Sequence, residues 1–424
     1  MFRKISLFKT LIVVLLICFT AKIFAGYKLQ NTFLQRGNSK TFLNLIAYNL
    51  VLHDEFSVAT GIPSVDYEPL YPMLMSAAYK ITGNDWIALT FIQALLHLLT
   101  SLLVFFLTKR IWNEIAGFIA ALYHAFYPYL FTYSLSIYDT TMFVFLLVSL
   151  VFLTIRTNFK ISHLAGIGIC LGLGLLTRGT TLTFIPPVLM YVAYIAYKNG
   201  GFIKMIKQPA LIILVMFLTL SPWLMRNYNY TKRIAISTHG PFGLWQGNNS
   251  YTEHYLSNNI SLDEIYRLKP PPDIYAKYPM QQRMPEDAVL VADAYKEEAR
   301  NWITENPETF IRLAFIKAQK LWTWNRNPFS SNPVYGSNEG RSTTYLISYL
   351  PLLLTLPFGL FLLVKGKWEY AVLIILILLS FTAAHMIAMG FTRARIPIDF
   401  LLMICFGIAV SWVLKKVFFE KFKR

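Results

Sequence analysis

The stretch that decides the fold is Trp86–Leu107, which reads WIALTFIQALLHLLTSLLVFFL and contains no charged residue. A helix of about 20 apolar residues crosses the hydrocarbon core of a bilayer, so this stretch predicts a transmembrane helix. The rest of the 424-residue chain is similar, with 55% hydrophobic and only 14% charged residues. Soluble domains carry about 25% charged residues. The composition therefore points to lipid as the solvent and excludes a disordered chain, a collagen-like fibre and a disulfide-stapled secreted domain.

Nine further apolar stretches predict spanning helices, a few of them short enough to need a thinned bilayer or partial burial. They are Phe8–Ala25, Ile115–Tyr133, Thr140–Ile155, Ile161–Thr177, Thr181–Tyr197, Pro209–Leu224, Tyr345–Val364, Tyr370–Met389 and Ile396–Val413. The sequence thus predicts an all-α polytopic membrane protein with about ten transmembrane helices. We expect the first stretch to be retained, because Ile23-Phe24-Ala25 is a poor signal-peptidase site.

The formal net charge of +17 follows the predicted topology. Lys and Arg are concentrated in the short loops on the side of the two termini, for example at Lys109-Arg110 and at Lys365 and Lys367. Because positive residues accumulate in cytoplasmic loops, we expect both termini to be cytoplasmic. The basic composition therefore indicates membrane orientation, and we expect membrane lipid as a partner and no nucleic acid.

Two outward segments, Gly26–Asp85 and Met225–Thr344, are long for a pure channel or carrier. Apolar residues at helical spacing predict an interfacial amphipathic helix over Lys40–His53, with Gly37-Asn38-Ser39 as its cap. A second short helix is predicted from Pro69 to Ile81. In the later segment, Met225–Pro285 is predicted to be mainly loop, with helices following over Glu286–Glu305 and after the Asn306 cap. The predicted domains are a seven-span N-terminal membrane module with the catalytic first outward loop 26–85 (1–224), an extracytoplasmic loop or cap (225–344) and a three-span C-terminal membrane module (345–424).

Three outward acids are candidates for a catalytic base. Asp139 opens the fourth predicted span, and Asp66 and Glu68 precede the second outward helix. An acid at the edge of a span is costly and therefore suggests function. The alternatives are that Asp139 only caps its helix, and that Asp66 and Glu68 are solvated loop acids, which fits Asp66 better.

Four arginines at the outward ends of predicted spans form a second group of candidate site residues. They are Arg178, Arg226, Arg393 and Arg395. A guanidinium matches the geometry of a phosphate, so these residues are candidates for binding a lipid phosphate. The alternative is that they are anchors whose charges reach for the membrane surface. No His and Asp cluster predicts a metal site, and we expect no cofactor.

In the order of its predicted spans, outward segments and candidate residues, the chain resembles the GT-C superfamily of integral-membrane glycosyltransferases, near glycosyltransferase family 39. That branch includes protein O-mannosyltransferases and relatives of the lipid A aminoarabinose transferase. The resemblance covers nearly the whole chain and rests on five stretches: Glu68–Pro72 (EPLYP), Leu176–Arg178 (LTR), Pro222–Tyr228 (PWLMRNY), Ser237–Asn249 (which ends LWQGNN) and Arg393–Pro397 (RARIP).

The resemblance implies a bacterial inner-membrane enzyme that moves a hexose or pentose from a polyprenyl phosphate to a glycan, lipid or protein acceptor outside the membrane, with inversion. A carboxylate would take the acceptor proton, and arginines would stabilise the departing phosphate. Asp139 is favoured as the base, because its position matches an acidic residue common in the family. Residues expected to contact the acceptor or donor are Asn38, Tyr71, His385, Asn248 and Asn249.

One departure from the family bears on catalysis. Family members usually carry an Asp just before the first interfacial helix, where this chain has Asn38. An amide cannot accept a proton at neutral pH, so another acid must serve as base, or the enzyme is impaired. Two alternative functions remain open: a transporter or flippase of a lipid-linked sugar, and a catalytically silent relative that binds the carrier. An ion-coupled transporter needs intramembrane acids, of which Asp399 is the clearest here.

Overall fold

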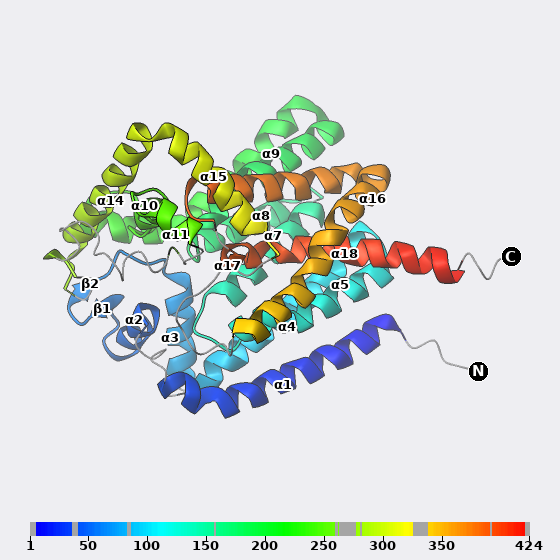
Figure 1. Ribbon diagram of the computed structural model, residues 1–424, viewed down its shortest axis with the longest axis horizontal. Helices are drawn as coiled ribbons and strands as arrows, with labels where there is room; N and C mark the ends of the chain where they lie inside the picture. Colours follow the sequence, from blue (N-terminus) through cyan, green and yellow to red (C-terminus); the bar gives the residue numbers. More distant parts are fainter. Residues whose placement is uncertain are drawn as a thin grey trace.

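The computed structural model describes residues 6–35, 41–82, 86–156, 158–258, 262, 277–279, 282–324, 338–390 and 392–419. These residues are almost entirely helical (Figure 1). The sheet found among them is a single hairpin of β1 (Ser57–Ala59) and β2 (Ile62–Pro63). The all-α architecture expected from the sequence is confirmed.

Five helical stretches in the described part of the chain are long and apolar enough to cross a membrane. They lie in α1 (Leu7–Gln35), α4 (Trp86–Ile111), η2 (Gly179–Phe184) with α9 (Ile185–Thr231), and α16 (Asn338–Ile387). The fifth, Arg393–Val417, runs from α17 (Thr392–Arg395) through α18 (Asp399–Leu414) into η6 (Lys415–Phe419). Shorter apolar helices pack among them: α5 (Glu114–Phe126), α7 (Thr140–Arg156) and α8 (Ile161–Leu175). The chain is therefore a multi-pass membrane protein.

Helices α9 and α16 each contain two of the predicted spans. Helix α9 is broken at Gly200-Gly201, where Gly201 has φ 73°, a conformation that favours glycine. Helix α16 is broken at Lys367, and Figure 1 shows it folding back on itself. The expected spans at 181–197 and 209–224, and those at 345–364 and 370–389, are thus arms of bent helices. The predicted span Ile115–Tyr133 is divided at Tyr127 between α5 and the short helix α6 (Pro128–Tyr133), so as a single spanning helix it was wrong.

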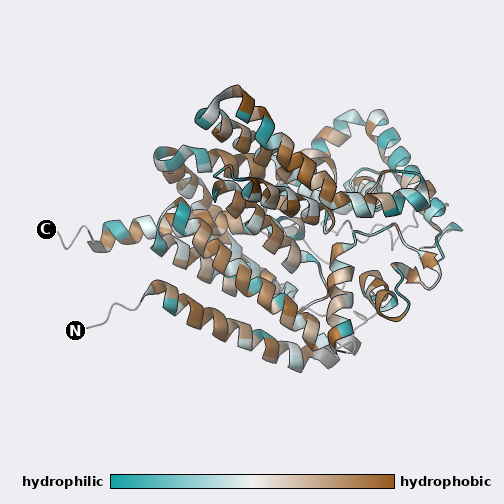
Figure 2. Ribbon diagram, turned by 180° about the vertical axis from the view of Figure 1, so that it is seen from behind, coloured by the Kyte–Doolittle hydropathy of each residue, from teal (hydrophilic) through white to brown (hydrophobic). Residues whose placement is uncertain are grey.

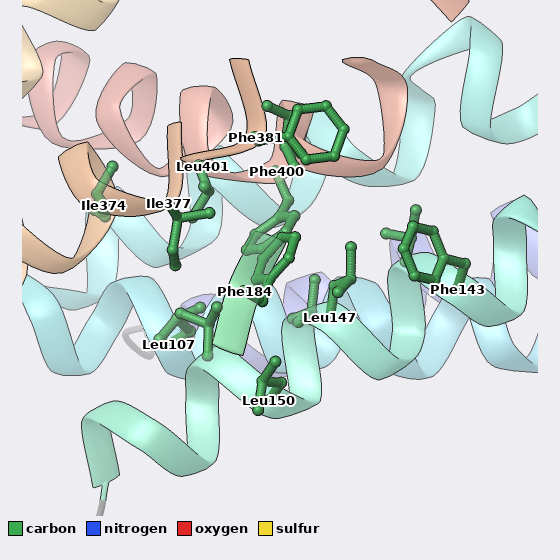
Figure 3. Close-up of a cluster of buried hydrophobic side chains, with 14 of the residues drawn as sticks. Leu107, Phe143, Leu147, Leu150, Phe184, Ile374, Ile377, Phe381, Phe400 and Leu401 are labelled. Carbon is green, nitrogen blue, oxygen red and sulfur yellow. The ribbon is translucent and has the colours of Figure 1, made fainter. Parts of the chain in front are cut away.

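The core of the bundle lies where α4, α7, η2, α16 and α18 meet (Figure 3). Phe184 from η2 and Phe381 from α16 are fully buried, with ring centroids 6.4 Å apart. Phe143, near the start of α7, is fully buried in the same cluster. This end of the core supports the polar residues described below.

The first outward segment forms α2 (Phe42–Leu52), the hairpin β1–β2 and α3 (Leu70–Thr82). Both predicted helices are present, within two residues of their expected bounds at each described end. Thr41 caps α2, because its side chain accepts a hydrogen bond from the amide of Asn44. The expected cap Gly37-Asn38-Ser39 lies outside the described residues. The hairpin was not predicted, because its strands are only three and two residues long.

In its described residues, the second outward segment contains four helices, which we call the cap. Helices α14 (Pro285–Glu305) and α15 (Pro307–Trp322) lie where the sequence predicted them. The prediction that 225–285 is mainly loop was wrong in part: α9 continues to Thr231, and α10 (Gly240–Gln246) and α11 (Thr252–Ser257) follow. Figure 2 shows hydrophilic residues concentrated on these cap helices and hydrophobic ones on the bundle. Both ends of the chain lie at the opposite end of the molecule from the cap (Figure 1).

A buried lysine holds α1 against the bundle. Lys22 is only 1% exposed, contacts Nδ1 of His97 on α4, and donates to Oγ of Ser134 at 2.9 Å. His124 on α5 lies beside this pair, with its ring centroid 4.8 Å from that of His97. A cation inside a span is costly unless polar groups surround it. These contacts therefore fix the position of the first helix.

Candidate functional site

The centre of the site is an ion pair between Arg178 and Asp139. Arg178 lies in the extended link between α8 and η2, and Asp139 immediately precedes α7. The Nε of Arg178 donates to Oδ2 of Asp139 at 2.9 Å, and Nη2 donates to Oδ1, so the pair is bidentate. The guanidinium also lies 4.9 Å from the ring centroid of Phe143. Both side chains keep some exposure, 29% and 18%, so a ligand can reach them.

The second carboxylate of the site is Glu68. The amide of Leu70 donates to the carbonyl of Leu176 at 3.0 Å, which fixes the start of α3 on the end of α8. The Oε1 of Glu68 consequently lies 4.0 Å from where a Cβ on Gly179 would be, next to Arg178 in the chain. Ser237 from the cap donates to the same Oε1 at 3.1 Å. Glu68 therefore lies beside Gly179, the residue that follows Arg178, at the end of the bundle that faces the cap.

Electrostatics distinguish Glu68 from the other acids. Burial raises the pKa of Glu68, and the nearby charge of Asp139 adds to the rise, while His239 and the Ser237 hydroxyl act in the opposite direction. A carboxylate with a raised pKa is better matched to accepting a proton near neutral pH. The His239 ring stacks on Tyr67 at 5.8 Å, which places a third titratable group beside Glu68.

Asp66 joins the first outward segment to the cap. It is 5% exposed, accepts a hydrogen bond from Thr238 at 2.9 Å and pairs with Arg283 at 3.3 Å. The alternative that Asp66 is a solvated loop acid is therefore wrong. Because its charge is matched by Arg283, Asp66 fits a role in holding the two segments together.

Tyr71 supports the turn that carries Asp139. Its hydroxyl is buried and donates to Oε1 of Gln93 at 3.2 Å, and Nε2 of Gln93 donates to the carbonyl of Ser136 at 3.0 Å. Burial raises the pKa of Tyr71 well above its usual range, so the hydroxyl stays protonated. This arrangement favours positioning of the site over the predicted substrate contact.

His385, near the end of α16, lies on the bundle side of the site. Its ring stacks on Phe381 with centroids 4.2 Å apart, and Nδ1 lies 2.8 Å from the carbonyl oxygen of Phe381. That bond places a proton on Nδ1 and leaves Nε2 as an acceptor. The side chain is 7% exposed and interacts electrostatically with Arg178.

The other three predicted phosphate-binding arginines do not join Arg178. Arg226 donates to the carbonyls of Ser64 and Phe56 at 2.9 and 3.3 Å, and so holds the hairpin against α9. Arg395 is fully buried and pairs with Asp399 at 2.7 Å. Arg393 is exposed on the one-turn helix α17 (Thr392–Arg395). The structure thus places Arg178 at an outward carboxylate, while Arg226 and Arg395 are engaged elsewhere.

Asn248 and Asn249 are buried, and their side chains form hydrogen bonds with other residues of the protein. The Nδ2 of Asn248 donates to the carbonyls of Leu244 and Ile387 at 2.8 Å, and its Oδ1 accepts from Lys317 at 3.1 Å. The Nδ2 of Asn249 donates to the Trp245 carbonyl at 2.7 Å. These contacts favour a structural role for both residues. Asn38 lies outside the described residues.

Lys317 on α15 is the centre of this buried cluster, and the sequence analysis missed it. Its ammonium group lies 3.1–3.2 Å from Oδ1 of Asn248 and from three carbonyl oxygens, those of Gly247, Ile387 and Ala388. The backbone is so close here that a Cβ on Gly247 would overlap Ala388. The contacts join the cap to the end of α16.

The sequence analysis also missed Ser237, Thr238 and His239 as site residues. The stretch Ser237–Asn249 was quoted for the resemblance, but the contacts of its first residues with Glu68 and Asp66 cross about 170 residues of chain. Among the described residues, no group of three His, Cys, Asp or Glu side chains could hold a metal ion.

Comparisons with known proteins agree with this geometry. Residues 66–225, which contain Asp66, Glu68, Asp139 and Arg178, match the family described as dolichyl-phosphate-mannose-protein mannosyltransferase. No curated protein matches the chain by sequence.

Solved structures with a similar fold include the oligosaccharyltransferase of Archaeoglobus fulgidus. Its apo form is 15% identical with a TM-score of 0.59, and the match covers 99% of this chain and 52% of that one. The complex of archaeal AglB with an inhibitory peptide and a dolichol-phosphate is 14% identical with a TM-score of 0.54, covering 90% and 47%. ArnT from Cupriavidus metallidurans bound to undecaprenyl phosphate also matches, at 12% identity and a TM-score of 0.40, covering 94% and 78%.

The chain spans about half the length of the archaeal oligosaccharyltransferases it matches. The resemblance to the GT-C glycosyltransferases that the sequence indicated is confirmed by the family match and by the shared fold.

Proposed function

We propose that this protein is an inverting glycosyltransferase that moves a hexose or pentose from a polyprenyl-phosphate donor to an acceptor at the outer face of the bacterial cytoplasmic membrane. The observation that carries the proposal is the position of Glu68 beside Gly179 and within the electrostatic influence of Asp139, so that it lies near the Arg178–Asp139 pair and next to the cap. A group able to take a proton and a group able to hold a phosphate are what such a transfer requires. The dolichol-phosphate bound to archaeal AglB, which has the same fold, supports a lipid-phosphate donor.

In the proposed reaction, Glu68 removes the proton from the acceptor hydroxyl. The acceptor oxygen attacks the anomeric carbon on the face opposite the phosphate, so the configuration inverts. The bond from the anomeric carbon to the phosphate oxygen breaks, and its electron pair leaves with the polyprenyl phosphate. Arg178 stabilises the charge that develops on that phosphate.

The proposal gives Asp139 a different role from the one the sequence favoured. Both of its carboxylate oxygens accept hydrogen bonds from Arg178, so the charge of Asp139 is already matched by the guanidinium. We assign Asp139 as a positioning residue, which holds the guanidinium in the orientation that a phosphate needs. Glu68 replaces it as the base, because its raised pKa suits proton transfer.

The test uses the purified full chain in detergent with a polyprenyl-phosphate hexose or pentose and a membrane extract as the source of acceptor. The readout is release of polyprenyl phosphate, measured by mass spectrometry. Removing a general base typically costs about 10²- to 10⁴-fold in rate, so Glu68→Gln should release polyprenyl phosphate that much more slowly. Donor binding should remain, because Arg178 and Asp139 are unchanged.

The matched control is Asp54→Asn, which removes a carboxylate from the same outward segment. Among the residues that the structure describes, Asp54 pairs with Lys80 at the exposed surface, so this variant should keep wild-type activity. If the wild-type protein binds the donor but releases no polyprenyl phosphate with any donor sugar or extract, the silent carrier-binding alternative is correct. If no lipid phosphate binds, the donor assignment is wrong.

The transporter alternative is less well supported. Ion coupling would use Asp399, the clearest acid within a span, but this residue is fully buried and fully engaged. Its oxygens accept hydrogen bonds from Arg395 at 2.7 Å and from Tyr127 at 2.8 Å. An acid held between a guanidinium and a hydroxyl fits a structural role.

The proposed orientation places the cap and the site outside and both termini in the cytoplasm. It is supported by the Lys and Arg residues of the short loops at the end of the bundle away from the cap. With this orientation, Arg178 lies at the end of the bundle that faces the outer leaflet.

A further inference from the structure

A pocket in the cap adjoins the site and has no role in the mechanism above. It lies between the end of α9, the segment 235–241 and helix α14, and its volume is about 150 Å³. A pocket of that volume accommodates roughly ten water-sized groups, which is close to the number of non-hydrogen atoms in one sugar ring with its substituents. A peptide or a prenyl chain would require a larger pocket. We call it the cap pocket.

The cap pocket is separated from the catalytic carboxylate by a single side chain. Ser237 lines the pocket and donates to Oε1 of Glu68 at 3.1 Å. The next residue, Thr238, also lines the pocket and donates to Asp66 at 2.9 Å. If a ligand binds against Ser237, the ligand hydroxyl nearest to this wall is separated from Glu68 by the Ser237 side chain alone.

The lining has the character of a sugar site. Thr231, Ser237 and Thr238 supply hydroxyl groups, while Val289 and Ala292 on α14 supply an apolar wall. Small-molecule pockets typically combine apolar surface with a few polar groups that fix orientation. A sugar ring matches such a lining, because it has hydroxyl groups at its edge and C–H groups on its faces.

The charges of the lining indicate what the sugar carries. Arg233 pairs with Asp293 at 2.7 Å, so these two charges balance. Lys296, also on the lining, is exposed and has no hydrogen bond or ion pair with any other residue that the structure describes. The pocket therefore has one uncompensated cation, which suits an anionic group on the ligand.

We propose that the cap pocket binds an acidic sugar unit of the acceptor, with its carboxylate or phosphate at Lys296 and its reacting hydroxyl directed past Ser237 to Glu68. This inference rests on the proposed function, because a position next to Glu68 matters for an acceptor only if transfer occurs. It makes Lys296 a specificity-determining residue.

Binding is measured without donor, on the full chain in detergent at low salt, by titration calorimetry. The probes are a hexose, the matching hexuronate and the hexose 6-phosphate. Both acidic sugars should bind more tightly than the neutral hexose, by about three- to fivefold for an exposed charge pair, and added salt should reduce the preference. The hexuronate and the phosphate together identify which anionic group the pocket prefers.

Lys296→Gln should abolish the preference for acidic sugars and leave binding of the neutral hexose unchanged. The matched control is Arg300→Gln, one helical turn further along α14 and outside the lining, which removes the same charge and should keep the preference. Ala292→Phe, which fills the pocket, should weaken binding of all three sugars.

The outcomes separate the two proposals. Equal binding of neutral and acidic sugars, or equal effects of Lys296→Gln and Arg300→Gln, would overturn the acidic-sugar site even if the enzyme consumes donor. Acid-selective binding that depends on Lys296, in a protein that consumes no donor, would support the pocket and overturn the proposed function.

Discussion

At the scale of single residues, Glu68 should set the acid limb of the pH–rate profile. The base must be deprotonated to act, so activity should rise with pH through the pKa of Glu68, which burial raises. The Ser237 hydroxyl lowers this pKa by donating to the carboxylate. Ser237→Ala should therefore move the acid limb to higher pH, as measured from polyprenyl phosphate release.

Thr238→Ala is the control for that shift. It removes a neighbouring hydroxyl that bonds Asp66 and not Glu68, so it should leave the position of the acid limb unchanged. If the limb moves equally in both variants, or in neither, Glu68 is not the group that titrates.

Arg178 offers a second prediction at this scale. Arg178→Lys keeps the positive charge but cannot make two parallel hydrogen bonds to Asp139 or to a phosphate. We expect kcat to fall by about 10²- to 10³-fold, as when a donor that stabilises the transition state is removed. Asp139→Asn should cause a smaller loss. An inactive Asp139→Asn with a near wild-type Glu68→Gln would restore Asp139 as the base.

Sequence patterns predicted some residue roles and missed others for a physical reason. Glu68 and Arg178 were predicted because each lies at the edge of a helix in a short recognisable motif. Arg226 and Arg395 have the same local pattern, but distant partners engage them: carbonyls 162 and 170 residues away for Arg226, and carbonyl and hydroxyl groups 74 and 50 residues away for Arg395. Local sequence does not contain such partners.

At the scale of elements, Lys317 should make a large contribution to the joint between cap and bundle. Lys317→Met removes the donor that four buried oxygens share, and of these the Ile387 carbonyl still accepts from Nδ2 of Asn248. An unsatisfied buried polar group costs about 1–3 kcal/mol, so we expect a clearly lower midpoint of thermal unfolding in detergent. Gln319→Met, at an exposed position on the same helix, is the control and should unfold as the wild type does. An unchanged midpoint for Lys317→Met would show that the joint does not depend on this residue.

Element positions were easier to predict than their connections. Apolar runs and proline or glycine boundaries predicted the helices of the bundle, α3, α14 and α15 to within a few residues. They also predicted two successive helices on either side of Gly200-Gly201 and of Lys367, where non-helical backbone separates the two arms of α9 and of α16. The short helices α10 and α11 were missed because six or seven residues carry too little periodicity.

At the scale of the whole molecule, the proposed orientation can be measured by cysteine labelling. In a background without Cys18, Cys170 and Cys405, a cysteine at Lys277, in the cap segment, should react with a membrane-impermeant thiol reagent added to intact cells. A cysteine at Lys415, after α18, should react only once the membrane is opened. The reverse pattern would place the cap in the cytoplasm and remove the outward site.

The buried contacts of Lys22 also determine the order in which the protein can be assembled. Its partners His97 and Ser134 lie 75 and 112 residues later in the chain. Helix α1 leaves the ribosome before these partners, so Lys22 has neither of them until α4, α5 and the turn after α6 (Pro128–Tyr133) have been synthesised. A chain that stops before residue 134 therefore leaves this lysine without its native hydroxyl partner.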